Sequence, residues 1–123
     1  MCPKPDEQKS PDELLAEVRR EFRDGLPSRV EKIRSALEQL AGGYDAAAAD
    51  TFYRAAHSLK GTAASFEADE LVGPAAALTD VGLRWFEGGE LDLTEVDAAF
   101  ADLERLVGAI QSYSARLEDD AAG

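Results

Sequence analysis

The sequence predicts an all-α protein, an antiparallel up-and-down four-helix bundle with either an extra N-terminal helix or a kinked first helix. Apolar residues recur at steps of three or four along four helix-sized segments, and glycine pairs at residues 42–43 and 88–89 mark two of the boundaries between them. Nowhere does the sequence alternate apolar and polar residues as a half-buried strand would. Amphipathic helices joined by short loops must bury their apolar faces against one another, and a bundle is the simplest arrangement that does so.

The chain length of 123 residues suits a single domain with one hydrophobic core. Residues 1–9 contain two prolines and several charges without apolar periodicity, so we expect a disordered leader there. The helical bundle is predicted to span residues 10–117. Residues 118–123 are expected to form a frayed tail.

The first helix is predicted to begin at Ser10, whose hydroxyl can cap it, with a proline next and Glu13 at the capping-box position. Its apolar face continues to about residue 41 and consists of Leu14, Val18, Phe22, Leu26, Val30, Ile33, Leu37 and Leu40. Gly25 and Pro27 interrupt this segment. Because proline removes a helical hydrogen bond, we expect two helices, or one helix with a kink near Leu26.

Glycines precede the second predicted helix and follow the third. Gly42 and Gly43 end the first segment, and Asp45 can cap a helix that runs to about Ser65. A further helix is predicted from about Asp69 to Phe86. Its inward residues are expected to be Leu71, Ala75, Leu78 and Leu83, and Trp85 and Phe86 are expected to pack in the core or at the helix end.

The last helix is predicted to follow Gly88 and Gly89. Thr94, with Asp97 three residues later, is an acceptable cap for it. Its apolar face is predicted to comprise Val96, Phe100, Leu103, Val107, Ile110 and Leu117.

Composition and charge exclude several classes of function. A net charge of -12 would repel the phosphate backbone of nucleic acid. Cys2 is the only cysteine, so the chain has neither an internal disulfide nor a cysteine metal cluster. No signal peptide and no apolar run long enough to span a bilayer is present. We therefore expect a cytoplasmic protein, a monomer, that binds neither nucleic acid nor membrane.

His57 is the only histidine, and helical geometry places it opposite the apolar face of its helix. That apolar face is predicted to consist of Ala48, Phe52, Ala55, Leu59, Ala63 and Phe66. The residues expected to share the outer face with His57 are Asp50, Tyr53, Arg54, Lys60, Gly61 and Ala64. A lone histidine is often only a solvated surface residue or a packed core residue. The residues around His57 therefore decide whether it has a further role.

Two of those neighbours indicate a site for a phosphoryl group. Gly61 costs the helix about 1 kcal/mol relative to alanine, and its missing side chain would let a partner's backbone or a phosphoryl group approach the imidazole. Alternatively, Gly61 ends the helix. Lys60 follows His57 by three residues, where its ammonium could reach a phosphoryl oxygen on the ring.

The segment from Ala56 to Ser65, which contains His57-Ser58-Leu59-Lys60-Gly61, resembles the H-x-L-K-G signature of histidine phosphotransfer (HPt) domains. The preceding helix resembles the family's F-x-x-x-L-P-x-x-apolar pattern at Phe22, Leu26, Pro27 and Val30. The likeness extends from about Phe22 to Ile110. Two departures stand out. Glu67 replaces the usual glycine in the turn after the histidine helix, and Thr79-Asp80 replaces a commoner Leu-Glu.

The resemblance implies a phosphocarrier. A ring nitrogen of His57, usually Nε2, would attack a receiver-domain aspartyl phosphate, and a second response-regulator receiver aspartate would remove the phosphoryl group. Lys60 would stabilise charge on the transferring oxygens. The implied partners are response-regulator receiver domains and a sensor or hybrid histidine kinase. They would dock around Asp50, Tyr53, Arg54 and Ala64. The chain itself needs no cofactor, since Mg²⁺ would belong to the receiver's acidic pocket.

Two other functions are also compatible with the sequence. The chain could be a non-catalytic helical adaptor that binds receiver domains, or the N-terminal phosphoacceptor domain of a larger chemotaxis-type histidine kinase. An autonomous enzyme is disfavoured because the sequence has neither G-x-x-x-x-G-K-[ST] nor G-x-G-x-x-G for nucleotide binding. One histidine without a cysteine pair makes no recognisable zinc site either.

Overall fold

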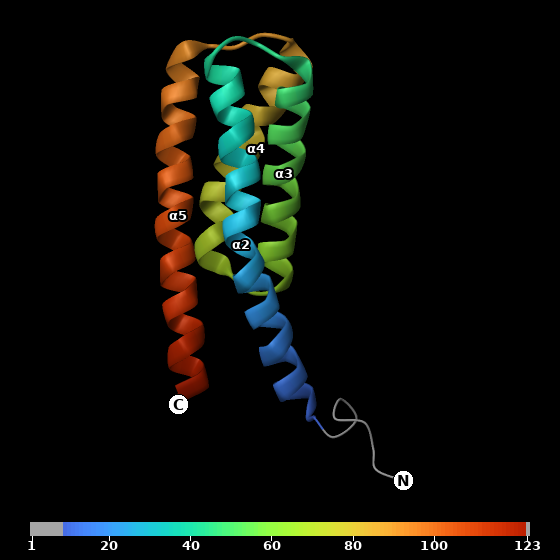
Figure 1. Cartoon of the computed structure of the whole chain (residues 1–123), viewed down its shortest axis with the longest axis vertical. Coiled ribbons are helices and arrows are strands. Elements are labelled where there is room, and N and C mark those ends of the chain that lie inside the picture. Colours follow the sequence, from blue (N-terminus) through green and yellow to red (C-terminus); the bar gives the residue numbers. More distant parts are fainter. Residues whose placement is uncertain (1–8, 123) are drawn as a thin grey trace.

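The computed structural model describes residues 9–122, which form four antiparallel helices without any strand in that range (Figure 1). These helices are α2 (Pro11–Ala41), α3 (Ala46–Ser65), α4 (Asp69–Gly88) and α5 (Leu93–Ala122). The predicted all-α up-and-down bundle is therefore confirmed. The predicted leader, including Cys2, lies outside the described residues except for Lys9.

The first predicted helix is one continuous helix, so the alternative of a separate N-terminal helix is wrong. The Ser10 hydroxyl caps α2 by accepting a hydrogen bond from the Glu13 backbone amide, at 3.2 Å. Pro27 lies inside the helix without ending it. Leu26 and Val30, on either side of the proline, are both buried in the core, and this burial offsets the lost hydrogen bond. Figure 1 shows the N-terminal part of α2 leaning away from α5.

The apolar face of α2 is buried only from Phe22 onward. Leu14 and Val18, which were predicted to face the core, are 39% and 41% exposed. The reason is the unequal length of the helices, because the first turns of α2 extend beyond the end of the α3–α4 pair (Figure 1). Apolar periodicity identifies which face of a helix is apolar, but not where its neighbours end.

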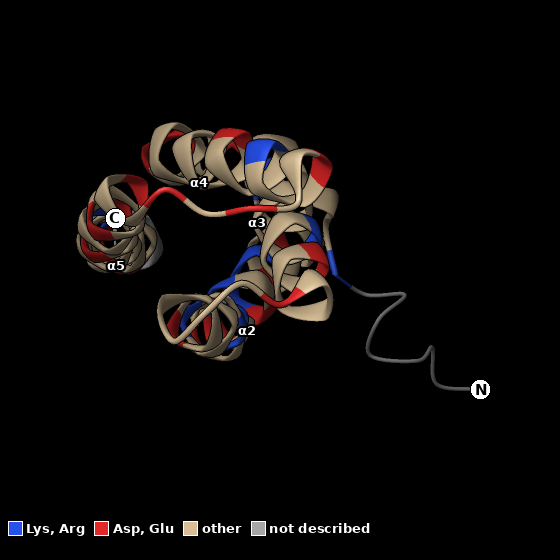
Figure 2. Ribbon diagram, turned by 90° about the horizontal axis from the view of Figure 1, so that it is seen from above, with Lys and Arg blue, Asp and Glu red and all other residues tan. Residues whose placement is uncertain are grey.

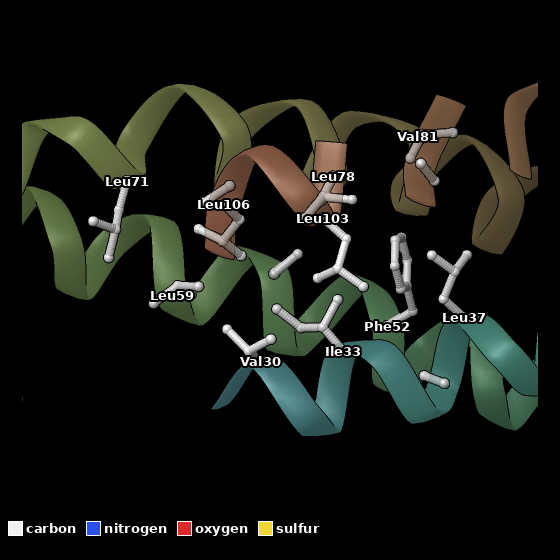
Figure 3. Close-up of a cluster of buried hydrophobic side chains, with 14 of the residues drawn as sticks. Val30, Ile33, Leu37, Phe52, Leu59, Leu71, Leu78, Val81, Leu103 and Leu106 are labelled. Atoms are coloured by element: carbon white, nitrogen blue, oxygen red, sulfur yellow. The ribbon is translucent and has the colours of Figure 1, made fainter. Parts of the chain in front are cut away.

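All four helices contribute to one core. Figure 3 shows the side chains of α2, α3, α4 and α5 meeting in the middle of the bundle. The labelled core residues are Val30, Ile33, Leu37, Phe52, Leu59, Leu71, Leu78, Val81, Leu103 and Leu106. In addition, the buried Trp85 ring lies 5.5 Å from that of Phe52, measured between centroids. The rotation of each helix about its axis is thereby fixed.

The ends of α5 differ from the prediction. The helix begins at Leu93, and its hydrogen bonds identify Asp92 rather than Thr94 as the cap. Asp92 Oδ1 accepts hydrogen bonds from the backbone amide and the hydroxyl of Thr94, at 2.9 and 2.6 Å. These bonds hold the pKa of the Asp92 carboxyl below its usual value. At the other end, α5 is helical through Ala122, beyond the predicted end of the bundle at residue 117.

The turn between α3 and α4 has the geometry that the family's usual glycine would supply, although Glu67 occupies it. Glu67 has a left-handed φ of 57°. The Ala68 amide donates to the Ala63 carbonyl at 2.8 Å, and the Glu67 amide donates to the Ala64 carbonyl at 3.2 Å. These two bonds define a Schellman ending of α3, and the buried Ala63 and Ala68 form its apolar contact.

Contacts with α2 and α5 hold this turn in place. Arg116 on α5 donates from Nη2 to the Glu67 carbonyl at 3.0 Å, and from Nε and Nη2 to the Glu70 carboxylate at 2.8 and 3.0 Å. The Arg116 guanidinium lowers the pKa of Glu70. On the other side, Phe66 stacks on Phe22 of α2 with ring centroids 5.0 Å apart. The left-handed residue is therefore supported by tertiary contacts.

Gly82 sets the distance between α3 and α4. A Cβ atom at this buried position would lie 2.9 Å from Phe52 Cδ1 and 3.2 Å from Tyr53 Cα. A real side chain would push the two helices apart, because a tightly packed core has little free space. The close approach occurs one turn before His57, so the glycine also fixes what α4 can place beside that residue.

We predict that Gly82→Ala lowers the free energy of unfolding by about 1 kcal/mol, because overpacking outweighs the gain in helix propensity. Denaturant unfolding followed by circular dichroism measures the change. Gly108→Ala is the matched control, since a Cβ at that exposed helical position meets nothing within 4 Å. A stabilisation by Gly82→Ala equal to that of Gly108→Ala would contradict the packing role.

We predict that Glu67→Gly raises the free energy of unfolding by about 1 kcal/mol, because glycine adopts a left-handed φ without strain. The lost ion pair with Arg19 contributes little, since its atoms are 3.5 Å apart and the Glu67 side chain is 78% exposed. The comparison variant Glu67→Ala removes the same carboxylate and keeps the strain, so it should not stabilise. The same unfolding experiment tests both, and a less stable Glu67→Gly protein would refute the strain argument.

Candidate functional site

Helix α3 directs His57 away from the core. Phe52, Leu59 and Ala63 on its inner face are fully buried, whereas His57 is exposed. The predicted direction of the imidazole is therefore confirmed. The inner face includes the buried Ala56, while Ala55, predicted to face inward, is only half-buried.

Two aromatic rings lie beside the imidazole on the side that faces α4. The Tyr53 ring lies 5.7 Å from the His57 ring, and the Phe86 ring of α4 stacks on Tyr53 at 6.3 Å with an interplanar angle of 18°. A shallow depression results. It is lined by Asp50, Tyr53, Arg54, His57, Ser58 and Phe86. The structure thus brings together four of the predicted site residues and adds Ser58 and Phe86.

Phe86 lies near the end of α4, as predicted, but on the outer side of the helix. Its ring stacks on Tyr53 and is 42% exposed, while its neighbour Trp85 is buried. Adjacent residues on a helix point about 100° apart, so both rings could not enter the core. The 100° spacing can be deduced from the sequence. The contact with Tyr53 cannot, because it depends on how α4 packs against α3.

Asp50 and Arg54 form an ion pair with each other at the rim of the depression. Arg54 Nε donates to Asp50 Oδ1 at 2.6 Å, across one helical turn. This bond raises the pKa of the guanidinium above its usual value. An exposed pair of this kind contributes little to the stability of the helix, because solvent screens its charges. Its main effect is to hold two charged side chains in place next to the imidazole.

The surface after His57 on α3 carries little side-chain volume. Gly61 and Ala64 are exposed, and a Cβ at Gly61 would meet nothing within 4 Å. Gly61 lies inside the helix, so the alternative that it ends the helix is wrong. The Thr62 hydroxyl bonds to the Ser58 carbonyl at 2.8 Å, back along the helix. Among residues 9–122, no contact requires a glycine at position 61, because a Cβ there would lie in open space.

Lys60 is half-buried and forms no ion pair with any residue in the range 9–122. It is three residues from His57, on the adjacent ridge of the helix, and does not line the depression. Asp50, Tyr53 and Arg54 do line it.

The second departure from the family pattern is harmless to the fold. Thr79 is buried in α4, and its hydroxyl donates to the Ala75 carbonyl at 2.7 Å, so its polar group is satisfied within the helix. Asp80, its neighbour, is exposed.

Residues 9–122 contain neither a cluster of metal-binding side chains nor a helix that could span a membrane. Over residues 9–122, no three His, Cys, Asp or Glu side chains are grouped so that they could hold a metal ion. Within the same range, every helix is too short or too polar to cross a bilayer.

Comparison with known protein families gives one result. The family model for the Hpt domain matches residues 17–119, a range that includes most of α2 and α5 and all of α3 and α4. Comparison with curated proteins and with solved structures returned no match. The matched range is most of the chain and contains the exposed His57 on α3. The chain therefore belongs to the Hpt domain family, whose members are phosphocarriers in two-component phosphorelays rather than true enzymes.

Proposed function

We propose that His57 is the phosphoacceptor of this Hpt domain, and that it relays a phosphoryl group between the aspartates of response-regulator receiver domains. The observation that supports this most directly is the exposed imidazole, which lies between a shallow aromatic depression and a bare stretch of helix. A phosphoryl group attached to it would lie outside the bundle. His57 is also the only histidine in the sequence.

In the proposed reaction, a ring nitrogen of His57 attacks the phosphorus of a receiver's aspartyl phosphate in line with the bond to the carboxyl oxygen. The N–P bond forms as that P–O bond breaks, and the aspartate leaves as a carboxylate. The other ring nitrogen keeps its proton during the attack. Transfer to a second receiver reverses these changes, so the chain returns to its starting state.

Lys60 is proposed to stabilise the phosphoryl oxygens during transfer. Its spacing from His57 places it within one helical turn of the ring, and an ammonium is a compact donor to phosphate oxygens. Mg²⁺ is proposed to be held by the carboxylates of the receiver, where it would neutralise further charge. The Hpt chain would then supply the nucleophile, one cation and an open approach.

The proposed partners are receiver domains and a sensor or hybrid histidine kinase. They would dock over the outer face of α3, on Tyr53, Arg54 and Ala64 together with Phe86 of α4. The exposed Phe86 ring adds apolar area to a surface that is otherwise polar. A monomeric carrier in the cytoplasm fits this exchange.

We predict that His57→Gln abolishes transfer of label from a phosphorylated receiver, while the helix content and the unfolding midpoint stay close to those of the unsubstituted protein. The label on the unsubstituted chain should be acid-labile and alkali-stable. A phosphotransfer profile against the receiver domains of the source organism measures this. Label that persists in His57→Gln would refute the proposal, and tight receiver binding without any label on the unsubstituted chain would support an adaptor instead.

We predict that Gly61→Ala stabilises the protein by about 1 kcal/mol, whereas Gly61→Leu slows transfer by about tenfold or more, because a bulky side chain blocks the approach to His57. Gly108→Ala is again the matched control. It should stabilise to the same degree and leave the transfer rate unchanged, since Gly108 lies on α5. Equal transfer rates for Gly61→Leu and the unsubstituted protein would remove Gly61 from the site.

A further inference from the structure

The charges of this acidic protein are unevenly distributed among its helices. The net charge is -12, and α5 carries seven acidic residues against two basic ones. Helix α3 is the opposite, with Asp50 against Arg54 and Lys60. In Figure 2, Lys and Arg positions appear on both α2 and α3, whereas α5 shows mainly Asp and Glu positions. The helix that carries His57 therefore has a charge balance opposite in sign to that of the whole molecule.

The cations gather in a groove between α2 and α3. We call this the α2–α3 groove, and its lining residues are Arg29, Lys32, Arg54, Ala55 and Ser58. Three of these five are basic and none is acidic. Arg29 and Lys32 make no ion pair with other residues in the described part of the chain, and Arg54 pairs only with Asp50. The Arg29 guanidinium lies over the Phe22 ring at 5.9 Å, which holds its stem against α2.

This groove is continuous with the depression beside His57. Arg54 and Ser58 line both of them. The imidazole thus has an aromatic flank toward α4 and a cationic flank toward α2. A protein that covers His57 must come close to the groove as well.

We infer that the α2–α3 groove binds an acidic segment of the receiver domain that exchanges phosphate with His57. This inference rests on the proposed function. In the proposed reaction the receiver carries the phosphorylated aspartate and the carboxylates that hold Mg²⁺, so its docking face would include several carboxylates. Repulsion between such a face and a carrier of net charge -12 opposes association. The α2–α3 groove would present positive charge where the two proteins meet. Such a charge raises the association rate more than it strengthens the final complex.

The test compares two double variants that change the net charge equally. Arg29→Glu with Lys32→Glu reverses the groove. Arg20→Glu with Arg105→Glu reverses two exposed cations elsewhere, on α2 and α5. The probe is the receiver domain that labels the unsubstituted chain fastest, and the association rate constant is measured by stopped flow from low to physiological salt. Circular dichroism checks that both variants are folded, and Lys32→Glu alone serves as a milder variant.

We expect the groove variant to associate about tenfold more slowly at low salt, with a weaker salt dependence, and the control variant to change by less than about twofold. Equal slowing in both variants, or no slowing in the groove variant, would overturn the inference. So would displacement of the receiver by millimolar inorganic phosphate, which would indicate a small-anion site instead.

A small phosphodonor separates this inference from the proposed function. Phosphoramidate can transfer its phosphoryl group to an imidazole, with cleavage of its P–N bond and release of ammonia, and it has no protein surface to dock. The groove variant should be labelled by phosphoramidate at the same rate as the unsubstituted chain. If neither phosphoramidate nor any receiver labels the unsubstituted chain, the proposed function fails. If both label it and the groove variant associates normally, only the groove inference fails.

Discussion

The burial of one face of α3 against the rest of the bundle determines what this protein can present to a partner. Phe52, Leu59 and Ala63 are fully enclosed, so α3 cannot turn about its axis without exposing apolar area. A rotation of one residue, about 100°, would carry His57 to the side of the helix. The core therefore sets the direction of the imidazole. Gly82 lets α4 come close enough to place Phe86 against Tyr53. The outer surface depends on the inner packing.

Most of the fold follows from the sequence because its signals are local. Apolar spacing identifies the inner face of each helix, and a capping side chain such as Ser10 or Asp45 marks where a helix begins. The exposure of Leu14 depends instead on where α3 and α4 end. The continuity of α2 through Pro27 likewise depends on the core contacts around it. Both features depend on tertiary packing, so they cannot be predicted from a short stretch of sequence.

In the candidate site, too, some features follow from one helix and others depend on packing between helices. The outward direction of His57 and the bare surface at Gly61 follow from one helix alone, so the sequence predicts them. The aromatic flank needs Phe86 from α4, and the cationic groove needs Arg29 and Lys32 from α2. Both flanks arise from packing between helices. The strained turn at Glu67 is similar, since Arg116 of α5 supports it from far along the chain.

A relay on a single imidazole places a constraint on the surface around it. If His57 both accepts and donates the phosphoryl group, the donor and the acceptor receiver must reach the same ring nitrogen over the same face of α3. That face cannot be shaped to one partner without excluding the other. A side-chain-poor surface at Gly61 and Ala64 suits two partners, because it imposes little shape of its own. Discrimination between receivers then falls to the two flanks, the aromatic contact of Phe86 and the α2–α3 groove, which lie farther from the transferring atoms.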